Sequence, residues 1–258
     1  MKSIVLCEGR DDLWFIAYYL HKTAGWNTCK PSWNNYNVSR QNDLQEVQYL
    51  EKGTDSVAIW CVGGKDCFGA VISTIFKKFI EDYPFDPVDS IVIVRDRDND
   101  TTNKAISTIQ SWMPKSVELN NKISTTWVDE IDGYDLAIKI TPIVIPFTEN
   151  GAIETLLMQS IKEQGCEGEI IVQGANEYIN NLLAHSEIGT NYLSHDRLIL
   201  KARYSAVIAA TNPSHSTAFF RNMVMACPWE KSANVKEHFD VIIDAISSTN
   251  VQKALESC

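Results

Sequence analysis

The chain has 258 residues, which is enough to bury a core, and its 45% hydrophobic and 22% charged residues argue against a disordered protein. Its formal net charge of −10 counts against nonspecific coating of nucleic acid, which requires clustered lysine and arginine, but allows an enzyme with a local basic groove. The seven cysteines form no C-x-x-C pair, and the sequence has neither the pattern of a signal peptide nor an apolar run of transmembrane length. We therefore expect a cytoplasmic protein that does not contact a membrane.

Short apolar runs alternate with helical patterns over the first hundred residues. Three runs have the length and apolar character of buried strands: residues 4–7, 56–62 and 90–94. The spacing of apolar residues predicts helices over 11–22 and 69–80, and a polar loop with a short helix at 43–50 is expected within 26–53. Strands that alternate with helices predict an α/β fold with a parallel sheet.

The later chain is mostly helical by pattern. A helix over 104–112, a strand over 138–147 and a helix over 152–161 are predicted next. Four further helices are then expected, at 175–183, 194–210, 216–225 and 235–246. We expect an α/β domain of residues 1–162, with a parallel sheet flanked by helices, followed by a helical C-terminal extension of residues 163–258.

The first and third predicted strands end in carboxylates. Glu8 follows the first strand, and Asp96, Asp98 and Asp100 follow the third. Ligands of parallel sheets bind outside the carboxyl ends of the strands, and carboxylates gathered there repel one another unless a cation, a proton or water offsets the repulsion. An oxygen-only ligand set favours Mg²⁺ or Mn²⁺, and magnesium is commonly shared with substrate phosphates. The pattern therefore predicts phosphoryl transfer or phosphodiester hydrolysis.

The second strand ends in the turn Gly63-Gly64-Lys65. This turn lacks the glycine spacing and the hydroxyl residue of a P-loop. Either Lys65 contacts a phosphate together with the Gly63 and Gly64 backbone, or the pair of glycines forms only a tight turn.

These motifs resemble the Toprim domain, the metal-binding α/β module of topoisomerases, primases, overcoming-lysogenization-defect nucleases and small ribosomal-RNA maturases. The resemblance covers about the first 150 residues and is carried by Glu8-Gly9, Asp11, Asp12, Gly63-Gly64-Lys65 and Asp96-x-Asp98-x-Asp100. It implies a Toprim-like, Rossmannoid sheet. Topoisomerases and primases need further domains for which this chain has no room, so the resemblance is to the nucleases.

The resemblance also implies roles for individual carboxylates. Glu8 would act as general acid or base or as a metal ligand, and Asp96 and Asp98 would hold Mg²⁺, with Asp100 supporting them. Asp12 would complete a two-metal site, which clamps the attacking and leaving oxygens of an in-line displacement. Asp12 also suits the alternative role of a helix cap.

Two later segments add candidate residues. The segment 146–157 is similar to one in stand-alone Toprim-like proteins, which implies that Glu154 faces the same site. On the predicted helix 194–210, Lys201 with Arg197 and Arg203 is a candidate for contacting a substrate phosphate, and the alternative is a solvated face.

We expect a nuclease that uses Mg²⁺ or Mn²⁺ to cleave DNA or RNA, in nucleic-acid processing or in phage defence. A defence role would imply a partner ATPase, and a homo-oligomer is also open. One alternative is a non-catalytic, metal-dependent module that binds nucleic acid or a nucleotide. Another is a phosphatase or nucleotidyl transferase that acts on small phosphate esters.

Overall fold

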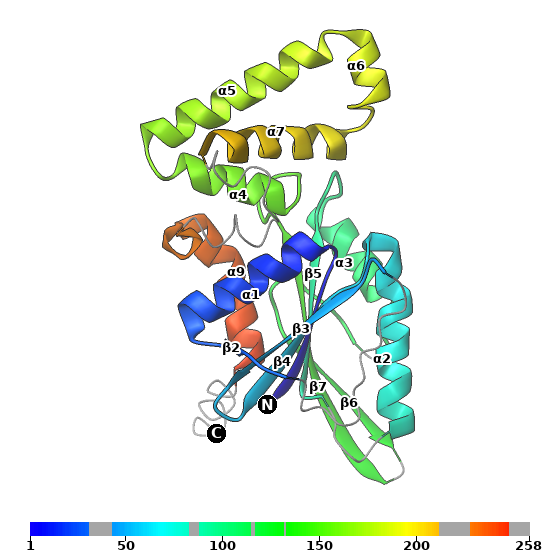
Figure 1. Ribbon diagram of the computed structural model, residues 1–258. Coiled ribbons are helices and arrows are strands. Elements are labelled where there is room, and N and C mark those ends of the chain that lie inside the picture. The colour runs from blue at the N-terminus through cyan, green and yellow to red at the C-terminus, as the bar shows by residue number, and fades with distance from the viewer. Residues whose placement is uncertain (31–42, 83–87, 115–116, 132, 212–227, 248–258) are drawn as a thin grey trace. The chain divides into compact units, whose positions relative to one another are not determined.

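The computed structural model describes residues 1–30, 43–82, 88–114, 117–131, 133–211 and 228–247, and Figure 1 shows the elements that they form. The chain divides into two compact units. The sheet unit consists of Met1–Arg95, Asp100–Val144 and the C-terminal segment from Phe239. The helical unit consists of Asp96–Asn99 and Ile145–His238.

A seven-stranded sheet forms the centre of the sheet unit, in the order β2-β3-β4-β1-β5-β7-β6. Its strands are β1 (Lys2–Cys7), β2 (Asn27–Thr28), β3 (Glu46–Lys52), β4 (Asp55–Cys61), β5 (Ser90–Asp96), β6 (Thr125–Ile131) and β7 (Tyr134–Ile145). β1 pairs in parallel with β4 and with β5, so that Leu6 is level with Trp60 on one side and Ile93 on the other. The predicted α/β fold with a parallel strand core is confirmed.

The flanks of the sheet are antiparallel, which the sequence did not indicate. β3 pairs antiparallel with β4, and β6 pairs antiparallel with β7. The prediction of a helix over 43–50 was wrong, because residues 46–52 form β3, and residues 31–42 of the predicted loop lie outside the described residues. Val47 and Tyr49, two residues apart, pack against the core, and Leu50, which follows Tyr49, is buried on the opposite face of the strand, as the alternation of a strand requires.

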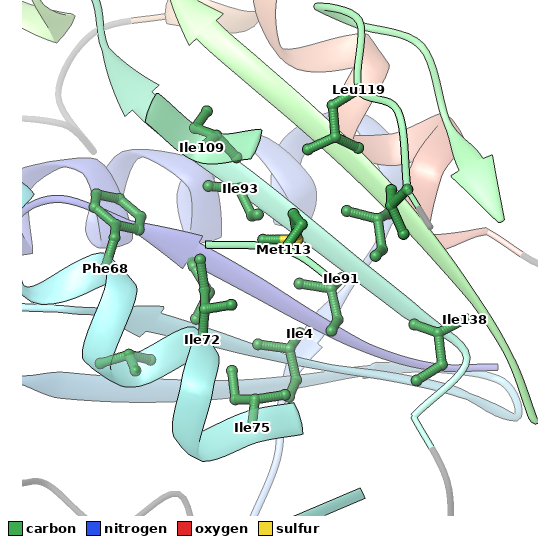
Figure 2. Packing of buried hydrophobic residues seen from close by; sticks show 14 of the residues in the cluster. Ile4, Phe68, Ile72, Ile75, Ile91, Ile93, Ile109, Met113, Leu119 and Ile138 are labelled. Atoms are coloured by element: carbon green, nitrogen blue, oxygen red, sulfur yellow. The ribbon is translucent and has the colours of Figure 1, made fainter. Parts of the chain in front are cut away.

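Helices pack on both faces of the central strands. On one face, Ile4, Leu6, Ile91 and Ile93 pack against α2 (Phe68–Asp82) and α3 (Thr102–Gln110), and Figure 2 shows this cluster. Ser90 alternates with Ile91 and so points to the other face, where its hydroxyl donates to the carbonyl of Ala245 at 3.0 Å.

The second face carries α1 (Arg10–Ala24) and the end of α9 (Ala233–Ile246). The Phe239 ring lies 5.0 Å from that of Phe15 and 5.5 Å from that of Tyr19, between ring centroids. The Tyr19 hydroxyl also donates to Asp240 at 2.7 Å. The predicted C-terminal helix is confirmed, but it returns to the sheet, so the division of the chain does not coincide with the boundary expected at residue 162.

The helical unit packs three helices around a small core of its own. Its elements are α4 (Ile153–Lys162), α5 (Cys166–Leu183), α6 (Ser186–Asn191), α7 (Asp196–Thr211), the 3₁₀ turn Trp229–Lys231 and the start of α9. α5 packs against both α4 and α7 and buries Val172, Ala175 and Ile179. The predicted helices at 152–161 and 194–210 are confirmed, α5 starts nine residues before the predicted 175, and the helix expected at 216–225 lies outside the described residues. None of the helices in the described ranges combines the length and the apolar character that a membrane crossing needs.

Candidate functional site

The turns after β1 and β4 meet through their backbones in the sheet unit. The amide of Val62 donates to the carbonyl of Cys7 at 2.9 Å, and the amides of Gly63 and Gly64 donate to the carbonyl of Glu8 at 3.2 and 3.0 Å. Gly63 and Gly64 have φ of +88° and +123°, which side-chain-bearing residues rarely adopt, so the turn requires both glycines. The structure thus brings Glu8 and the glycine turn together, as expected of neighbouring parallel strands.

Lys65 follows this turn and is exposed at the start of the 3₁₀ turn Lys65–Cys67. Its exposed ammonium is therefore accessible from solvent beside the glycine turn. A phosphate contact by Lys65 stays a prediction.

Asp12 closes the first turn of α1. Its Oδ2 accepts a hydrogen bond of 2.7 Å from the amide of Gly9, the residue that precedes the helix, and its side chain is buried. A carboxylate at this position satisfies a free backbone amide and interacts favourably with the helix dipole. The helix-cap role that the sequence left open is therefore present, and a catalytic role for Asp12 stays a prediction.

Three carboxylates of the helical unit surround the guanidinium of Arg197. Arg197 Nη2 donates to Asp96 Oδ2 at 2.8 Å, and Nη1 lies 3.7 Å from Asp98 Oδ1 and 3.4 Å from Glu154 Oε2. The side chains of Asp96 and Glu154 are only 1% and 5% exposed, so their charges need compensation inside the unit. We call Asp96, Asp98 and Glu154 the acidic trio.

The loop after β5 holds the first two members of the acidic trio. Asp98 has φ of +51°, a left-handed conformation that aspartate tolerates better than most residues. Its amide donates to the carbonyl of Gly151 at 2.6 Å and its carbonyl accepts from the amide of Gly151 at 2.8 Å, which makes a short antiparallel bridge. This bridge fastens the aspartate loop to the segment that leads into α4.

The first turn of α4 supplies the third carboxylate. Glu154 lies in that turn, where a negative charge is favoured, and the amide of Ile153 donates to Asp96 Oδ1 at 3.2 Å. At the start of α7, Asp196 Oδ2 accepts a hydrogen bond of 2.9 Å from Asn99. The N-termini of two helices therefore converge on the aspartate loop, one bringing Glu154 and the other Arg197.

Asp100 belongs to the sheet unit and has other partners. Its Oδ1 lies 2.6 Å from Lys104 Nζ, and its Oδ2 accepts from Arg95 Nη2 at 3.1 Å. The hydrogen bond from Lys104 lowers the pKa of Asp100 most, and Arg95 adds to this shift. Both oxygens of Asp100 are therefore engaged in fixing the start of α3.

The remaining cations of α7 differ in what they contact. Arg203 Nη2 donates to Asn180 Oδ1 at 2.8 Å, which joins α7 to α5. Lys201 is exposed and lies one helical turn after Arg197, on the same side of the helix. Its side chain is therefore accessible to an anionic ligand.

Within the described residues, no three Asp, Glu, His or Cys side chains are arranged to hold a metal ion. The acidic trio does not fit a bound Mg²⁺ as it stands, because Arg197 occupies the position between the carboxylates. We expected a cation, a proton or water to offset the carboxylates, and we named Arg197 only as a candidate phosphate contact, not as the partner of these carboxylates. Arg197 is 101 positions from Asp96, and no local pattern predicts contacts over such a separation.

Comparison with known proteins gives a fold and a family. No curated protein matches the chain. Among solved structures, the crystal structure of a hypothetical protein from Pyrococcus horikoshii OT3 is similar, with 16% sequence identity and a TM-score of 0.50 over 94% of this chain and 99% of that one. At this identity the similarity shows the fold alone. A family described as "Protein of unknown function (DUF3226)" matches residues 2–244, and the chain therefore belongs to the DUF3226 family.

Proposed function

We propose that the protein hydrolyses phosphodiester bonds of DNA or RNA and requires Mg²⁺ or Mn²⁺. The observation that carries the proposal is the convergence of Asp96, Asp98 and Glu154 on Arg197 in the helical unit. A guanidinium binds phosphate oxygens in the same forked geometry in which it binds carboxylates. The exposed Lys201, one turn away on α7, adds a second cation that can contact a phosphate.

The candidate residues have the following proposed roles. Glu8 is the general acid or base or a metal ligand, and Asp12 assists it in addition to capping α1. Asp96, Asp98 and Glu154 are the proposed metal ligands, although Arg197 lies between them in this structure. Asp100 supports the aspartate loop through its pairs with Lys104 and Arg95. The phosphate contacts are Gly63, Gly64, Lys65 and Lys201.

Cleavage assays with matched variants test this assignment. Single- and double-stranded DNA and RNA are incubated with Mg²⁺ or Mn²⁺, and with EDTA as the metal-free control. Glu8→Ala and Asp98→Asn should abolish cleavage and leave the circular dichroism spectrum unchanged, because asparagine also tolerates the left-handed backbone at 98. Asp129→Asn, which removes an exposed carboxylate from β6, should cleave like the wild type. A Glu8→Ala protein that cuts at the wild-type rate would remove Glu8 from the site.

A binding module without turnover is the second candidate, and one observation favours it. Arg197 already pairs with all three carboxylates of the acidic trio, so part of their negative charge is offset without a metal. Metal-dependent retention of nucleic acid or a nucleotide, with no product from any substrate, would select this function. Turnover of nucleotides but not of polynucleotides would instead select an enzyme of small phosphate esters.

The cellular setting is proposed from the sequence alone. We place the protein in the cytoplasm, in nucleic-acid processing or phage defence, with an ATPase partner that switches the nuclease on. Full activity of the purified chain by itself would remove the argument for such a partner.

A further inference from the structure

One end of the seven-stranded sheet is the strand β6, which pairs with β7 along all of its seven residues. Among the described residues, no strand pairs with the outer side of β6. An edge strand presents a row of backbone amides and carbonyls that can pair with a further strand. The outer side of β6 is therefore a surface on which another chain can extend the sheet.

The register of the hairpin determines which backbone groups of β6 face outward. The amide of Lys139 on β7 donates to the carbonyl of Asp89 at 2.9 Å, on the side of β7 that faces β5. Lys139 is opposite Thr126, so these two residues form a pair without hydrogen bonds between β6 and β7. Bonded and non-bonded pairs alternate along antiparallel strands. The amides and carbonyls of Thr126, Val128 and Glu130 therefore point away from β7.

The middle of this edge is apolar and accessible. Val128 is the central residue of β6, and it is 63% exposed. Charged residues, which commonly protect edge strands, occur here only toward the hairpin turn, as Asp129 and Glu130. Asp129 Oδ1 accepts a hydrogen bond of 2.9 Å from the amide of Glu130, so that amide already has an acceptor. The amides of Thr126 and Val128 are the donors that face outward along the rest of the strand.

The sequence of β6 is complementary to itself about Val128. When two copies of β6 pair antiparallel around a two-fold axis at Val128, this residue is opposite Val128 of the second copy. Thr126 is then opposite Glu130, and Trp127 is opposite Asp129, so no charge is opposite a like charge, which would destabilise the pair. The two Val128 residues exchange backbone hydrogen bonds, and each Thr126 amide donates to the carbonyl of Glu130. The Glu130 amide that Asp129 binds is not needed.

Exposed apolar side chains at both ends of the hairpin edge favour a second copy as the partner. Ile123 precedes β6 and is 57% exposed, and Tyr134 follows the end of β6 and is 52% exposed. The two-fold arrangement brings the start of one β6 beside the end of the other, so that Ile123 of one copy comes near the end that carries Tyr134 of the second copy. A second copy therefore matches the edge in its charges and at both ends.

We propose that two copies of this chain associate through β6, antiparallel and with the two-fold axis at Val128, so that their sheets join into one. Two-fold dimers are the commonest symmetric assemblies of soluble proteins. The interface lies wholly in the sheet unit. It is independent of the proposed phosphodiester hydrolysis.

Sedimentation velocity over a dilution series tests the association. The wild type should show an equilibrium between monomer and dimer. Val128→Pro removes the outward amides and should raise the dissociation constant of the dimer about tenfold or more. Its circular dichroism spectrum should stay that of the wild type, because proline is accepted on edge strands where the missing amide faces away from the sheet. A wild type that is monomeric throughout the series would overturn the proposal.

A matched pair of lysine variants locates the interface. Val128→Lys puts two like charges opposite each other at the axis and should also weaken the dimer. Ile170→Lys changes an equally exposed β-branched residue of α5 and should associate like the wild type. The lysine pair decides the question alone if the proline variant does not fold. A dimer that Val128→Lys leaves unchanged would place the interface elsewhere and refute the proposal.

Disulfide trapping tests the register, in a background in which Cys166, Cys227 and Cys258 are replaced by serine. Val128→Cys should form a cross-linked dimer with oxidised glutathione, because the Cα atoms of a hydrogen-bonded antiparallel pair are about 5.5 Å apart, within the span of a disulfide. Thr126→Cys is the control on the same face of the same strand. Its two copies would be four residues out of register, about 13 Å apart, and should not cross-link. Cross-linking by Thr126→Cys and not by Val128→Cys would refute the two-fold axis at Val128.

Discussion

Replacing Gly151 by alanine tests how much the backbone conformation at the bridge between the aspartate loop and α4 contributes to stability. Gly151 has φ of +139°, and a Cβ there would lie 2.0 Å from Oγ1 and 2.8 Å from Cβ of Thr155. Adopting such a backbone costs a residue with a side chain about 1–3 kcal/mol. Moving Thr155 away also removes its hydrogen bond with the amide of Ala152, worth about 0.5–1.5 kcal/mol. We expect a total loss of about 2–4 kcal/mol in the free energy of unfolding.

Urea unfolding followed by circular dichroism at 222 nm measures this loss. Gly174→Ala is the matched control, because Gly174 lies in the middle of α5 and nothing is within 4 Å of its Cβ position. The control should gain about 0.5–1 kcal/mol, since alanine is the better helix former. The double variant Gly151→Ala with Thr155→Ala removes the steric overlap but also the Thr155 hydroxyl that accepts from Ala152, so it should lose about 2–4 kcal/mol as well. A Gly151→Ala protein with the urea midpoint of the wild type would refute the reasoning.

Three further predictions concern single side chains. Asp12→Ala should lose about 1 kcal/mol of stability, whereas Asp12→Asn should keep most of the cap, so that a loss of cleavage by Asp12→Asn alone would reveal a chemical role. Because Lys104 lowers the pKa of Asp100 in the folded state, Asp100 should stabilise the wild type relative to Asp100→Asn above about pH 4. That advantage should disappear as the pH falls through the lowered pKa, and urea midpoints at pH 7, 5 and 3 measure it. His238→Phe keeps a ring that can stack on Phe147 but removes Nε2, which accepts a hydrogen bond of 3.0 Å from the amide of Phe147. The free energy of unfolding, measured by urea titration, should fall by about 1–3 kcal/mol.

The central strands were predictable because burial on both faces favours apolar residues along most of their length. Residues 4–7 and 91–94 are continuous apolar runs, and the structure places them in the adjacent parallel strands β1 and β5. β3 was not predictable in the same way, because only Leu50 of its residues is fully buried and its charged residues hide the alternation. Local patterns therefore predicted the central parallel strands of the sheet and did not predict the antiparallel strands that flank them.

The candidate site was predictable in its carboxylates but not in its cation. Asp96 and Asp98 follow a recognisable strand, and Glu154 begins a recognisable helix. Arg197 occurs on a helix with other cations, and only the tertiary structure distinguishes it from Arg203, which pairs with an amide. The other two carboxylates make local contacts: the cap of α1 by Asp12 was one of the alternatives that the sequence left open, and Asp100 pairs with Lys104 four residues later.

The return of α9 to the sheet unit affects the order in which this chain can fold during synthesis. Tyr19 and Asp240 are 221 positions apart, and Ser90 and Ala245 are 155 apart, so the face that carries α1 is covered only after nearly all the chain has been made. Closing such long loops slows folding, and until α9 arrives Phe15 and Tyr19 lack the ring of Phe239 against which they pack. A nascent chain that stalls before α9 would therefore present aromatic surface to chaperones and proteases.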